Sequence, residues 1–322
     1  MKKFVIGFVL ILLSIGMIGC SKQASSTKDF PEKSIQLIVA FSAGAATDTQ
    51  ARIIAKHAKK YLGQELVVVN KPGGGGQVGW NEFSTVKEDG YTLAAYNLPH
   101  IITQPLVSDT TFQLNTFEPL INWGGDPTVF AVKGDSDIQT LDELISKSKE
   151  SPNTMTIGNP GKYVGQHLAI LLLEQAAGIQ VEAVPYQGSS DAIAALLGGH
   201  IDVVAGNLSD IYRLGDDVTP LAIATEERHS FMPDLPTFKE LGYPTVIMST
   251  DRGIAAVKGT PPEIIEKLEA AFLKLMEDEE FLADMKKAGA DMLIMDRNEA
   301  KEDMKNRQEK YKALLETIDI PK

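Results

Sequence analysis

Three loops in this sequence carry residue types that can hold a small anion. The first lies between an apolar run and a helical pattern and reads Ser42-Ala43-Gly44-Ala45-Ala46-Thr47-Asp48. Small side chains let a ligand approach the backbone closely. Free N–H groups and the dipole at the start of a helix favour negative charge there. The loop is therefore a candidate anion site, or alternatively an ordinary tight turn in which Asp48 only caps the helix.

The other two loops also lie between a predicted strand and a predicted helix. Residues 158–167 offer backbone amides and the polar side chains of Lys162, Tyr163, Gln166 and His167. Residues 184–191 contain Gln187 within a Pro-Tyr-Gln-Gly turn. Open α/β sheets bind ligands outside the carboxyl ends of their strands, which favours ligand contact at both loops. The alternatives are a long surface loop for 158–167 and a Pro-Gly turn with a capping serine for 184–191.

Signatures of enzymes, metal sites and nucleotide cofactors are weak. The sequence contains neither GxSxG nor HExxH, and its five histidines are scattered. The tetraglycine at 73–76 lacks the Gly-Lys-Ser/Thr ending of a Walker loop, and we interpret it as a flexible loop of the first lobe. The acidic run at 277–280 is interpreted as a solvated helix end or turn. We therefore expect no catalytic residue, no metal and no cofactor, and a protein that is not an enzyme.

The elements that would position these loops alternate between strand and helix. An apolar strand, a helix capped by Thr47 or Asp48 and ended by Gly63, and a second strand form a βαβ unit, which implies a parallel sheet. The predicted strands are 35–41, 66–69, 91–96, 155–158, 181–184, 202–205 and 220–224. The predicted helices include 78–86, 141–149, 165–177, 189–197, one capped by Thr260 with Pro261 and Pro262 in its first turn, and 300–315.

Two long extended stretches, 119–133 and 246–257, flank the second α/β series. They predict two lobes joined by two crossing strands. The first lobe would be discontinuous, comprising 30–126 and 251–322, and the second would comprise 127–250. The fold class is therefore α/β with two lobes.

The N-terminus has the order of a secretory signal peptide. Met1-Lys2-Lys3 precedes an apolar run at 4–13 that is shorter than the ~20 residues a membrane-spanning helix needs. Met17-Ile18-Gly19-Cys20 resembles the lipobox of bacterial lipoproteins. We predict a signal peptide at 1–19, lipidation of Cys20, and a flexible tether at 20–29 that holds the body on the extracytoplasmic face of the membrane. The alternative is a cysteine that lies near a signal peptide by chance.

Charge and cysteine content exclude several classes of protein. The chain of 322 residues has a formal net charge of −12, which removal of Lys2 and Lys3 with the signal peptide lowers to −14. Nucleic-acid binding needs basic patches, so this balance argues against it. Cys20 is the only cysteine, which excludes an intramolecular disulfide.

Short motifs in a fixed order, from about residue 30 to 290, resemble the solute-binding receptors of tripartite tricarboxylate transporters, the Bug family. These motifs are Phe30-Pro31-Glu32-Lys33-Ser34-Ile35, Val39-Ala40-Phe41-Ser42-Ala43-Gly44-Ala45 with Asp48, Asn70-Lys71-Pro72-Gly73-Gly74-Gly75-Gly76, Asp89-Gly90-Tyr91-Thr92-Leu93, Val184-Pro185-Tyr186-Gln187-Gly188, Leu197-Gly198-Gly199-His200-Ile201-Asp202, Leu235-Pro236-Thr237 and Lys258-Gly259-Thr260-Pro261. The resemblance implies a type II periplasmic-binding-protein fold with hinge closure, a membrane transporter as partner, and a monomer.

The resemblance also implies where the ligand lies. A ligand carboxylate would sit on the backbone amides of Ala43, Gly44 and Ala45, Asp48 would orient a ligand amine or hydroxyl, and the loop 161–166 would hold the other end. Two positions depart from the family pattern, because Ala45 replaces a second glycine and Thr250-Asp251-Arg252-Gly253 replaces a stretch that is often aromatic-x-Gly. Arg252 can pair bidentately with a carboxylate if it faces the cleft, and is otherwise a surface arginine near the hinge. The expected ligand contacts are Phe41, Ala43, Gly44, Ala45, Asp48, Gly161, Lys162, Tyr163, Gln166, Gln187 and Arg252.

The expected function is capture of a small carboxylate for a secondary transporter. The ligand would be a di- or tricarboxylate, an aromatic acid or an acidic amino acid. The alternatives are a receptor for a membrane sensor kinase, an exported enzyme that acts on a carboxylate, and a receptor for a phosphonate or a metal complex.

Overall fold

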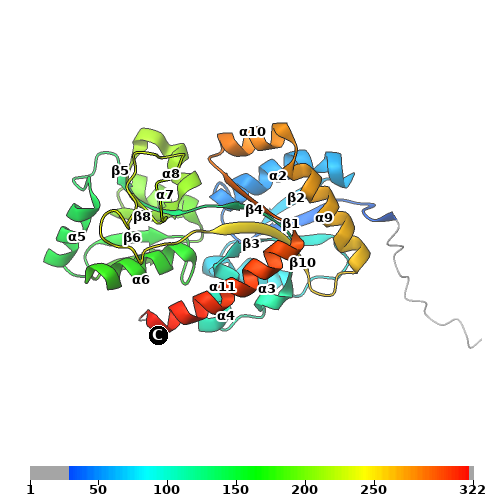
Figure 1. Cartoon of the computed structure of the whole chain (residues 1–322), viewed down its shortest axis with the longest axis horizontal. Coiled ribbons are helices and arrows are strands. Elements are labelled where there is room, and N and C mark those ends of the chain that lie inside the picture. Colours follow the sequence, from blue (N-terminus) through cyan, green and yellow to red (C-terminus); the bar gives the residue numbers. More distant parts are fainter. Residues whose placement is uncertain (1–28, 319–322) are drawn as a thin grey trace, which may run out of the picture. The chain divides into compact units, whose positions relative to one another are not determined.

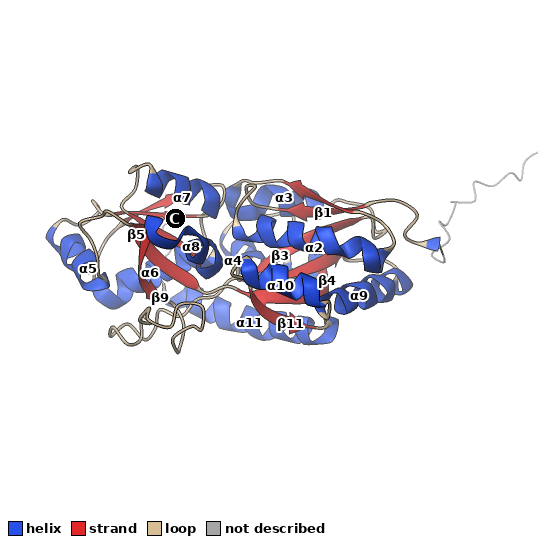
Figure 2. Cartoon of the chain, turned by 90° about the horizontal axis from the view of Figure 1, so that it is seen from above, coloured by secondary structure: helices blue, strands red, loops and turns tan. Residues whose placement is uncertain are grey.

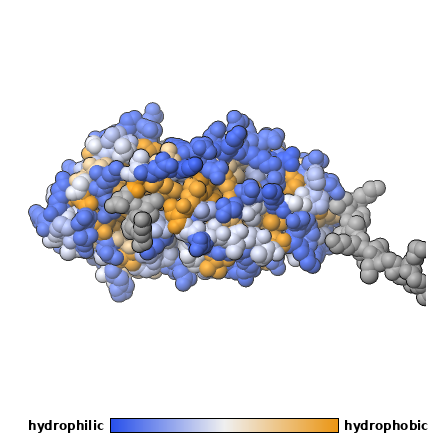
Figure 3. Space-filling model, turned by 90° about the horizontal axis from the view of Figure 1, so that it is seen from below, coloured by the Kyte–Doolittle hydropathy of each residue, from blue (hydrophilic) through white to orange (hydrophobic). Residues whose placement is uncertain are grey.

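The computed structural model describes residues 29–318, and Pro31–Lys322 forms one compact unit separate from Met1–Phe30. The predicted signal peptide, Cys20 and nearly all of the predicted tether lie outside the described residues. Among the residues that are described, no helix is both long and apolar enough to cross a bilayer. Figure 3 shows polar and charged side chains over most of the lower face, with apolar patches between them.

The first lobe is built on a six-stranded mixed sheet in the order β11-β4-β10-β3-β1-β2. β1 pairs in parallel with β2 and β3, whereas β10 is antiparallel to β3 and β4, and β11 is antiparallel to β4. In Figure 1, α2 and α10 lie above this sheet and α3, α4 and α11 lie below it. The strands are β1 Ile35–Val39, β2 Leu66–Asn70, β3 Thr92–Leu98, β4 Phe117–Gly125, β10 Asp251–Val257 and β11 Asp291–Met295. The helices are α2 Ala46–Leu62, α3 Gln77–Phe83, α4 His100–Val107, α9 Pro262–Met276, α10 Glu279–Lys287 and α11 Arg297–Thr317.

The second lobe is built on a five-stranded mixed sheet in the order β7-β6-β8-β5-β9. β6 is parallel to β7 and β8, and β5 is antiparallel to β8 and β9. Helices α5, α6, α7 and α8 pack around this sheet (Figure 2). The strands are β5 Thr128–Lys133, β6 Thr156–Asn159, β7 Glu182–Pro185, β8 Val203–Asn207 and β9 Val218–Ile223. The helices are α5 Leu141–Glu150, α6 Gly165–Ala177, α7 Ser189–Leu197 and α8 Leu208–Leu214.

Two chain segments cross between the sheets side by side. The first is Asp126-Pro127, between β4 and β5, and the second is the stretch that leads into β10. The Thr250 N–H donates to the Asp126 carbonyl (2.9 Å), and the Thr128 N–H donates to the Met248 carbonyl (2.9 Å). This arrangement confirms the predicted two-lobed α/β fold with two crossing strands. The lobe boundaries at 126 and 250 remain a proposal, which is supported by the points where the chain leaves each sheet.

Helix α11 also reaches from the first lobe to the second. It packs on α4, β4 and β11, and Figure 1 shows its C-terminal end below α6. There Gln175 Nε2 donates to the Thr317 carbonyl (3.3 Å). The C-terminal residues therefore contact both lobes, although the predicted division gave all of 251–322 to the first.

Local sequence explains the elements that position the cleft. β1 is buried at four of its five residues, as expected for a strand inside a sheet. Helix α2 ends at Gly63, whose left-handed φ of 75° suits glycine. Helix α5 begins with a capping box in which Thr140 and Glu143 each accept from the other's backbone N–H.

Several boundaries differ from the predictions. Helix α2 begins at Ala46 after Ala45, so Thr47 and Asp48 lie inside its first turn and do not cap it. Helix α9 begins after Pro261, while the hydroxyl of Thr260 donates to the Val257 carbonyl. The tetraglycine contains a 3-10 turn, Gly74–Gly76, in which Gly75 and Gly76 are buried, and its positive φ angles favour glycine. Helices α4, α8 and α10 and strand β11 were not predicted.

Candidate functional site

A small cavity lies at the seam between the two lobes, beside the crossing strands. Its volume is about 10 Å³, close to the ~10–15 Å³ that one water needs. Its walls come from the ends of strands and the loops and first helical turns that follow them, where open sheets bind ligands. The first lobe contributes Phe41, Ala45, Thr47, Asn97, His100 and Arg252; the second contributes Pro160, Gln166, Ser189 and Asn207; Thr250 comes from the crossing segment.

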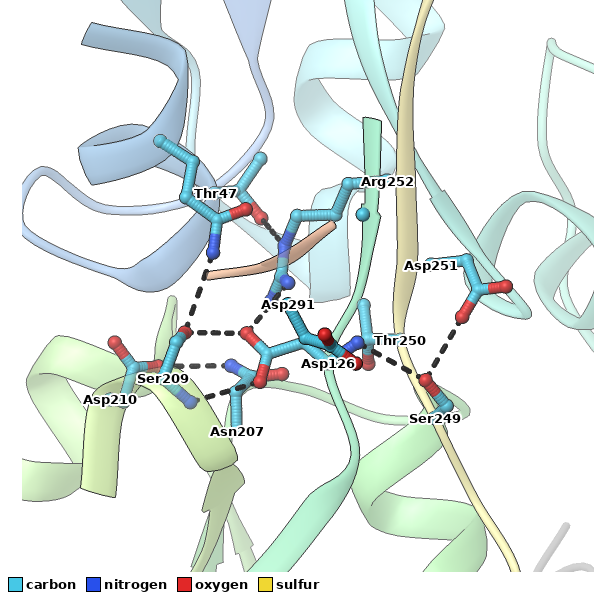
Figure 4. Close-up of polar contacts among 12 residues, drawn as sticks. Thr47, Asp126, Asn207, Ser209, Asp210, Ser249, Thr250, Asp251, Arg252 and Asp291 are labelled. Atoms are coloured by element: carbon cyan, nitrogen blue, oxygen red, sulfur yellow. Dashed lines mark hydrogen bonds and ion pairs between the residues drawn. The ribbon is translucent and has the colours of Figure 1, made fainter. Parts of the chain in front are cut away.

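Arg252 is a buried charge in the wall of this seam cavity. Its side chain is 1% exposed, which excludes the alternative of a surface arginine. Its Nη1 pairs with Asp126 Oδ2 at 2.7 Å, and its Nε donates to Thr47 Oγ1 at 3.0 Å (Figure 4). Within the described residues, Nη2 has no hydrogen-bond partner. The guanidinium is therefore held in place through Nε and Nη1 and keeps Nη2 for a further acceptor.

Asp126 joins three parts of the chain. It lies on the crossing segment and accepts from Arg252 of the first lobe and from Ser209 of the second, whose N–H and hydroxyl are 2.9 and 2.5 Å away. Burial raises the pKa of the Asp126 carboxyl above its usual range, while Arg252 and Ser209 oppose that shift. The seam therefore contains a buried ion pair in which Arg252 stabilises the ionised form of Asp126.

A chain of amides fixes the orientation of Gln166. Asp210 is paired with Arg213 at 2.6 Å, so its carboxylate only accepts hydrogen bonds. Asn207 must therefore point its Nδ2 at Asp210 (2.9 Å) and its Oδ1 at Gln166. Gln166 must in turn donate its Nε2 to Asn207 Oδ1 (2.6 Å) and to Thr250 Oγ1 (3.1 Å). The remaining atom, Gln166 Oε1, is the one left for the cavity.

Three buried polar atoms around the cavity have no hydrogen-bond partner within the described part of the chain. They are Asn97 Oδ1, His100 Nδ1 and Gln166 Oε1, on side chains that are each at most 2% exposed. Burial, with a smaller contribution from Arg252, lowers the pKa of His100 to about 3, so its ring is neutral at pH 7. Because buried polar groups are normally paired, their gathering at one cavity indicates a site for a polar ligand.

The loop 42–48 divides between the cavity and its rim. Ala45 lines the cavity together with Phe41, the residue before the loop, whereas Ala43 and Gly44 are exposed. Asp48 is buried, and its carboxylate accepts from the Gly44 N–H (2.8 Å) and from Asn70 Nδ2 (2.8 Å). Asp48 thus shapes the loop, and the Gly44 amide that was expected to hold a carboxylate is already occupied by it.

Four other predicted residues lie in a wider groove outside the cavity. Gly161, Lys162, Tyr163 and Gln187 line this groove, which has a volume of about 770 Å³. The lobes meet at its edge, where a Cβ on Gly161 would lie 2.4 Å from Gly75 Cα and Thr103 Oγ1 donates to the Tyr163 carbonyl (2.7 Å). The predicted contacts therefore separate into an inner set, an outer set and the loop residues Ala43, Gly44 and Asp48.

Several cavity residues were missed from the sequence. Asn97 and His100 flank the β3–α4 junction, and Asn207 ends β8. Each position follows the same rule that marked the three predicted loops, namely a polar residue where a strand gives way to a helix. The signal was present, but α4 and α8 were not predicted, so these two junctions were not considered.

The fold and the seam cavity define a two-lobed solute-binding protein of the periplasmic-binding-protein class. Residues 50–320 match the family described as the tripartite tricarboxylate transporter family receptor. The UPF0065 protein in gbd 5'region of Cupriavidus necator is 32% identical, covering 98% of this chain and 96% of that protein. Protein BugT of Bordetella pertussis is 31% identical, covering 74% and 75%. The chain therefore belongs to the tripartite tricarboxylate transporter receptor family.

Solved structures agree with this assignment. The periplasmic binding protein BugD is 27% identical with a TM-score of 0.84, covering 89% of this chain and 98% of that one. MatC from Rhodopseudomonas palustris, solved with bound malate, is 25% identical with a TM-score of 0.77, covering 81% and 90%. The predicted Bug-family resemblance is confirmed.

Proposed function

We propose that this receptor captures a small carboxylate between its lobes and delivers it to a tripartite tricarboxylate-type transporter. The observation that carries the proposal is Arg252, a buried cation whose Nη2 is unused, in a cavity that is also lined by unpartnered polar atoms. A guanidinium edge matches the two oxygens of a carboxylate. The bound malate of MatC supports the same ligand chemistry.

The binding cycle requires the lobes to part. A cavity of about 10 Å³ holds no organic acid, so the ligand enters an open form and the lobes close around it less tightly than here. Ala45 and Thr47, at the N-terminal end of α2, line the cavity, so the helix dipole there favours an anion. Closure then removes water and strengthens each of these interactions.

The predicted contacts take different roles in this proposal. Phe41, Ala45, Gln166 and Arg252 contact the ligand, while Asp48 holds the loop that carries Ala45 and does not touch the ligand. Gly161, Lys162, Tyr163 and Gln187 line the entrance, together with the exposed Ala43 and Gly44. The support for this division is the separation of the inner cavity from the outer groove.

Location and partners also remain proposals. A lipid anchor on Cys20 would keep the monomeric body at the extracytoplasmic face of the membrane, next to the transporter subunits. We further propose that the protein turns over no substrate. A receptor for a sensor kinase would use the same cleft, and deletion of the neighbouring transporter genes would separate the two, since only a transport receptor then loses its role in uptake.

A thermal-shift screen of the purified protein tests carboxylate binding. Because ligand that binds only the folded state raises Tm by mass action, about 100 Kd of ligand stabilises by ~2.7 kcal/mol. The screen uses mono-, di- and tricarboxylates, aromatic acids, phosphonates and divalent cations. We expect a shift with a carboxylate that Arg252→Gln abolishes and that Arg228→Gln, at an exposed pair with Glu240, retains. A shift with a phosphonate or a cation alone would refute the carboxylate proposal.

A further inference from the structure

The seam cavity presents hydrogen-bond acceptors as well as donors. Gln166 Oε1 faces it because the chain from Asp210 through Asn207 uses the amide Nε2 of Gln166. Asn97 Oδ1 is the second acceptor, since Asn97 Nδ2 donates to Thr47 Oγ1 at 3.0 Å. Both side chains are at least 98% buried, and both oxygens lack a partner among the described residues.

The donors of the cavity are separate groups. Thr47 Oγ1 accepts from Arg252 and from Asn97, so its own proton is free to be donated elsewhere. Thr250 Oγ1 accepts from Gln166, and its proton is free in the same way. With the free Nη2 of Arg252, these groups suffice for a carboxylate, but they leave the two amide oxygens unused.

Resting on the proposed function, we propose that the ligand carries a hydrogen-bond donor in addition to its carboxylate. That donor, a hydroxyl or an ammonium group, donates hydrogen bonds to Gln166 Oε1 and Asn97 Oδ1. An ionised carboxylate is an acceptor only, so a plain acid leaves both oxygens buried and unpaired when the lobes close. Sites built to bond a polar group strongly reject analogues that lack it. The ligand class is thus the small hydroxy or amino carboxylates.

A matrix of nine acids tests this inference at three chain lengths. The plain acids are propionate, succinate and glutarate; the hydroxy acids are lactate, malate and 2-hydroxyglutarate; the amino acids are alanine, aspartate and glutamate. Kd is measured by calorimetry at pH 7, where all carboxylates are ionised. At the chain length that fits the cleft, we expect the hydroxy or amino acid to bind at least tenfold more tightly than the plain acid.

The outcomes separate the inference from the function on which it rests. Plain acids that bind as tightly as their substituted partners overturn the inference and leave carboxylate capture intact. Absence of binding by all nine acids overturns the inference together with capture of a small aliphatic carboxylate. Comparison of the hydroxy acids with the amino acids identifies which donor the oxygens prefer.

A matched pair of variants assigns the effect to Gln166. Gln166→Leu removes the acceptor, and we expect the affinity ratio between the substituted and plain acid to fall at least threefold. Gln104→Leu is the control, because Gln104 is also buried with an unpartnered Oε1 but binds the Gly75 carbonyl outside the cavity (2.8 Å). An unchanged ratio in Gln166→Leu, or an equal fall in Gln104→Leu, would overturn the assignment. If Gln166→Leu does not fold, the nine-acid comparison still decides the inference.

Discussion

Replacement of Arg252 by glutamine tests whether the buried ion pair organises the seam. The substitution removes a guanidinium that is 1% exposed and leaves Asp126, 2% exposed, with only the two donors of Ser209. Breaking a buried pair by removing one partner costs about 3–5 kcal/mol, because the other charge stays buried without compensation. For roughly 290 folded residues, with an unfolding entropy of ~2.1 cal/mol/K per residue, this lowers Tm by about 5–8 °C.

The same substitution has a predictable dependence on pH. Burial already raises the pKa of Asp126, and loss of Arg252 raises it further, because Arg252 favours the ionised form. A folded pKa above the unfolded value of 3.8 means that the folded state binds more protons in the window above 3.8, so stability falls as pH rises through it. The stability deficit of Arg252→Gln should therefore be small near pH 4 and reach its full size near pH 7.

Urea unfolding of four proteins at pH 4 and pH 7 measures this effect. They are the wild type, Arg252→Gln, Asp126→Asn and the double variant, which lacks both charges of this pair. We expect the double variant to be more stable than the sum of the single effects predicts, with a coupling of about 1–3 kcal/mol at pH 7. Additive effects, or a deficit of Arg252→Gln that is equal at both pH values, would refute the reasoning.

Three further substitutions probe closure, the loop and the buried histidine. Gly188 has an extended φ, and Gly188→Ala places a Cβ 3.0 Å from the Ser42 N of the other lobe, so the variant should bind ligand severalfold more weakly in calorimetry. Gly198→Ala is the control, because its Cβ would lie equally close to His200 of its own lobe and should leave the affinity unchanged. Asp48→Asn removes the charge that the Gly44 N–H and Arg52 contact, and should lower the free energy of unfolding, measured in urea, by about 1–2 kcal/mol. An unchanged free energy of unfolding would show that Asp48 does not stabilise the loop. The folded pKa of His100, about 3, lies below the unfolded value of 6.5, so the neutral ring contributes stability that is lost as pH falls from 6.5 toward 3. His100→Phe should therefore flatten the plot of unfolding free energy against pH in that range. An unchanged slope would contradict this prediction.

The local sequence pattern was sufficient to predict the two-lobed α/β architecture. The bounds of α6 and α7 are those predicted, because glycine and serine begin them and Gly178 and Gly198 follow them. The crossing strands were predictable because the stretches 119–133 and 246–257 read as extended and carry apolar segments at 129–132 and 254–257, which need burial in a sheet. By contrast, the short helices α4 and α8 have eight and seven residues and little helical periodicity, since α4 is buried at five consecutive residues and α8 at four.

The contacts among the polar side chains of the seam could not be predicted from local sequence, for a different reason. Asp126 and Ser209 are 83 positions apart, and Arg252 and Thr47 are 205 apart. Arg252 could be recognised as unusual, but its direction depends on which way β10 presents it between β3 and β4. Only the three-dimensional arrangement shows that Asp126 pairs with the charge of Arg252, and that the carboxylate of Asp48 accepts a hydrogen bond from its own loop.

The unpaired atoms of the seam give a physical reason for closure to depend on ligand. At the rim, closure gains contacts such as Ser42 Oγ with Asp191 Oδ2 (2.5 Å) and Ser190 Oγ with the Ala43 carbonyl (3.1 Å). These bonds are exposed, and each contributes only ~0.5–1.5 kcal/mol net. In the centre, the empty closed form leaves polar atoms of Asn97, His100 and Gln166 buried, at a cost of about 1–3 kcal/mol each.

The two contributions are opposite in sign and each amounts to several kcal/mol at most, so without ligand the closed form should not be strongly favoured over the open form. A ligand can shift such an equilibrium only by its difference in affinity for the two forms. One that pairs the central atoms removes several kcal/mol of cost from the closed form alone, enough for a shift of 10²–10³-fold in the population ratio. The unpaired polar atoms of the empty seam thus make the equilibrium between open and closed forms depend on the chemistry of the ligand.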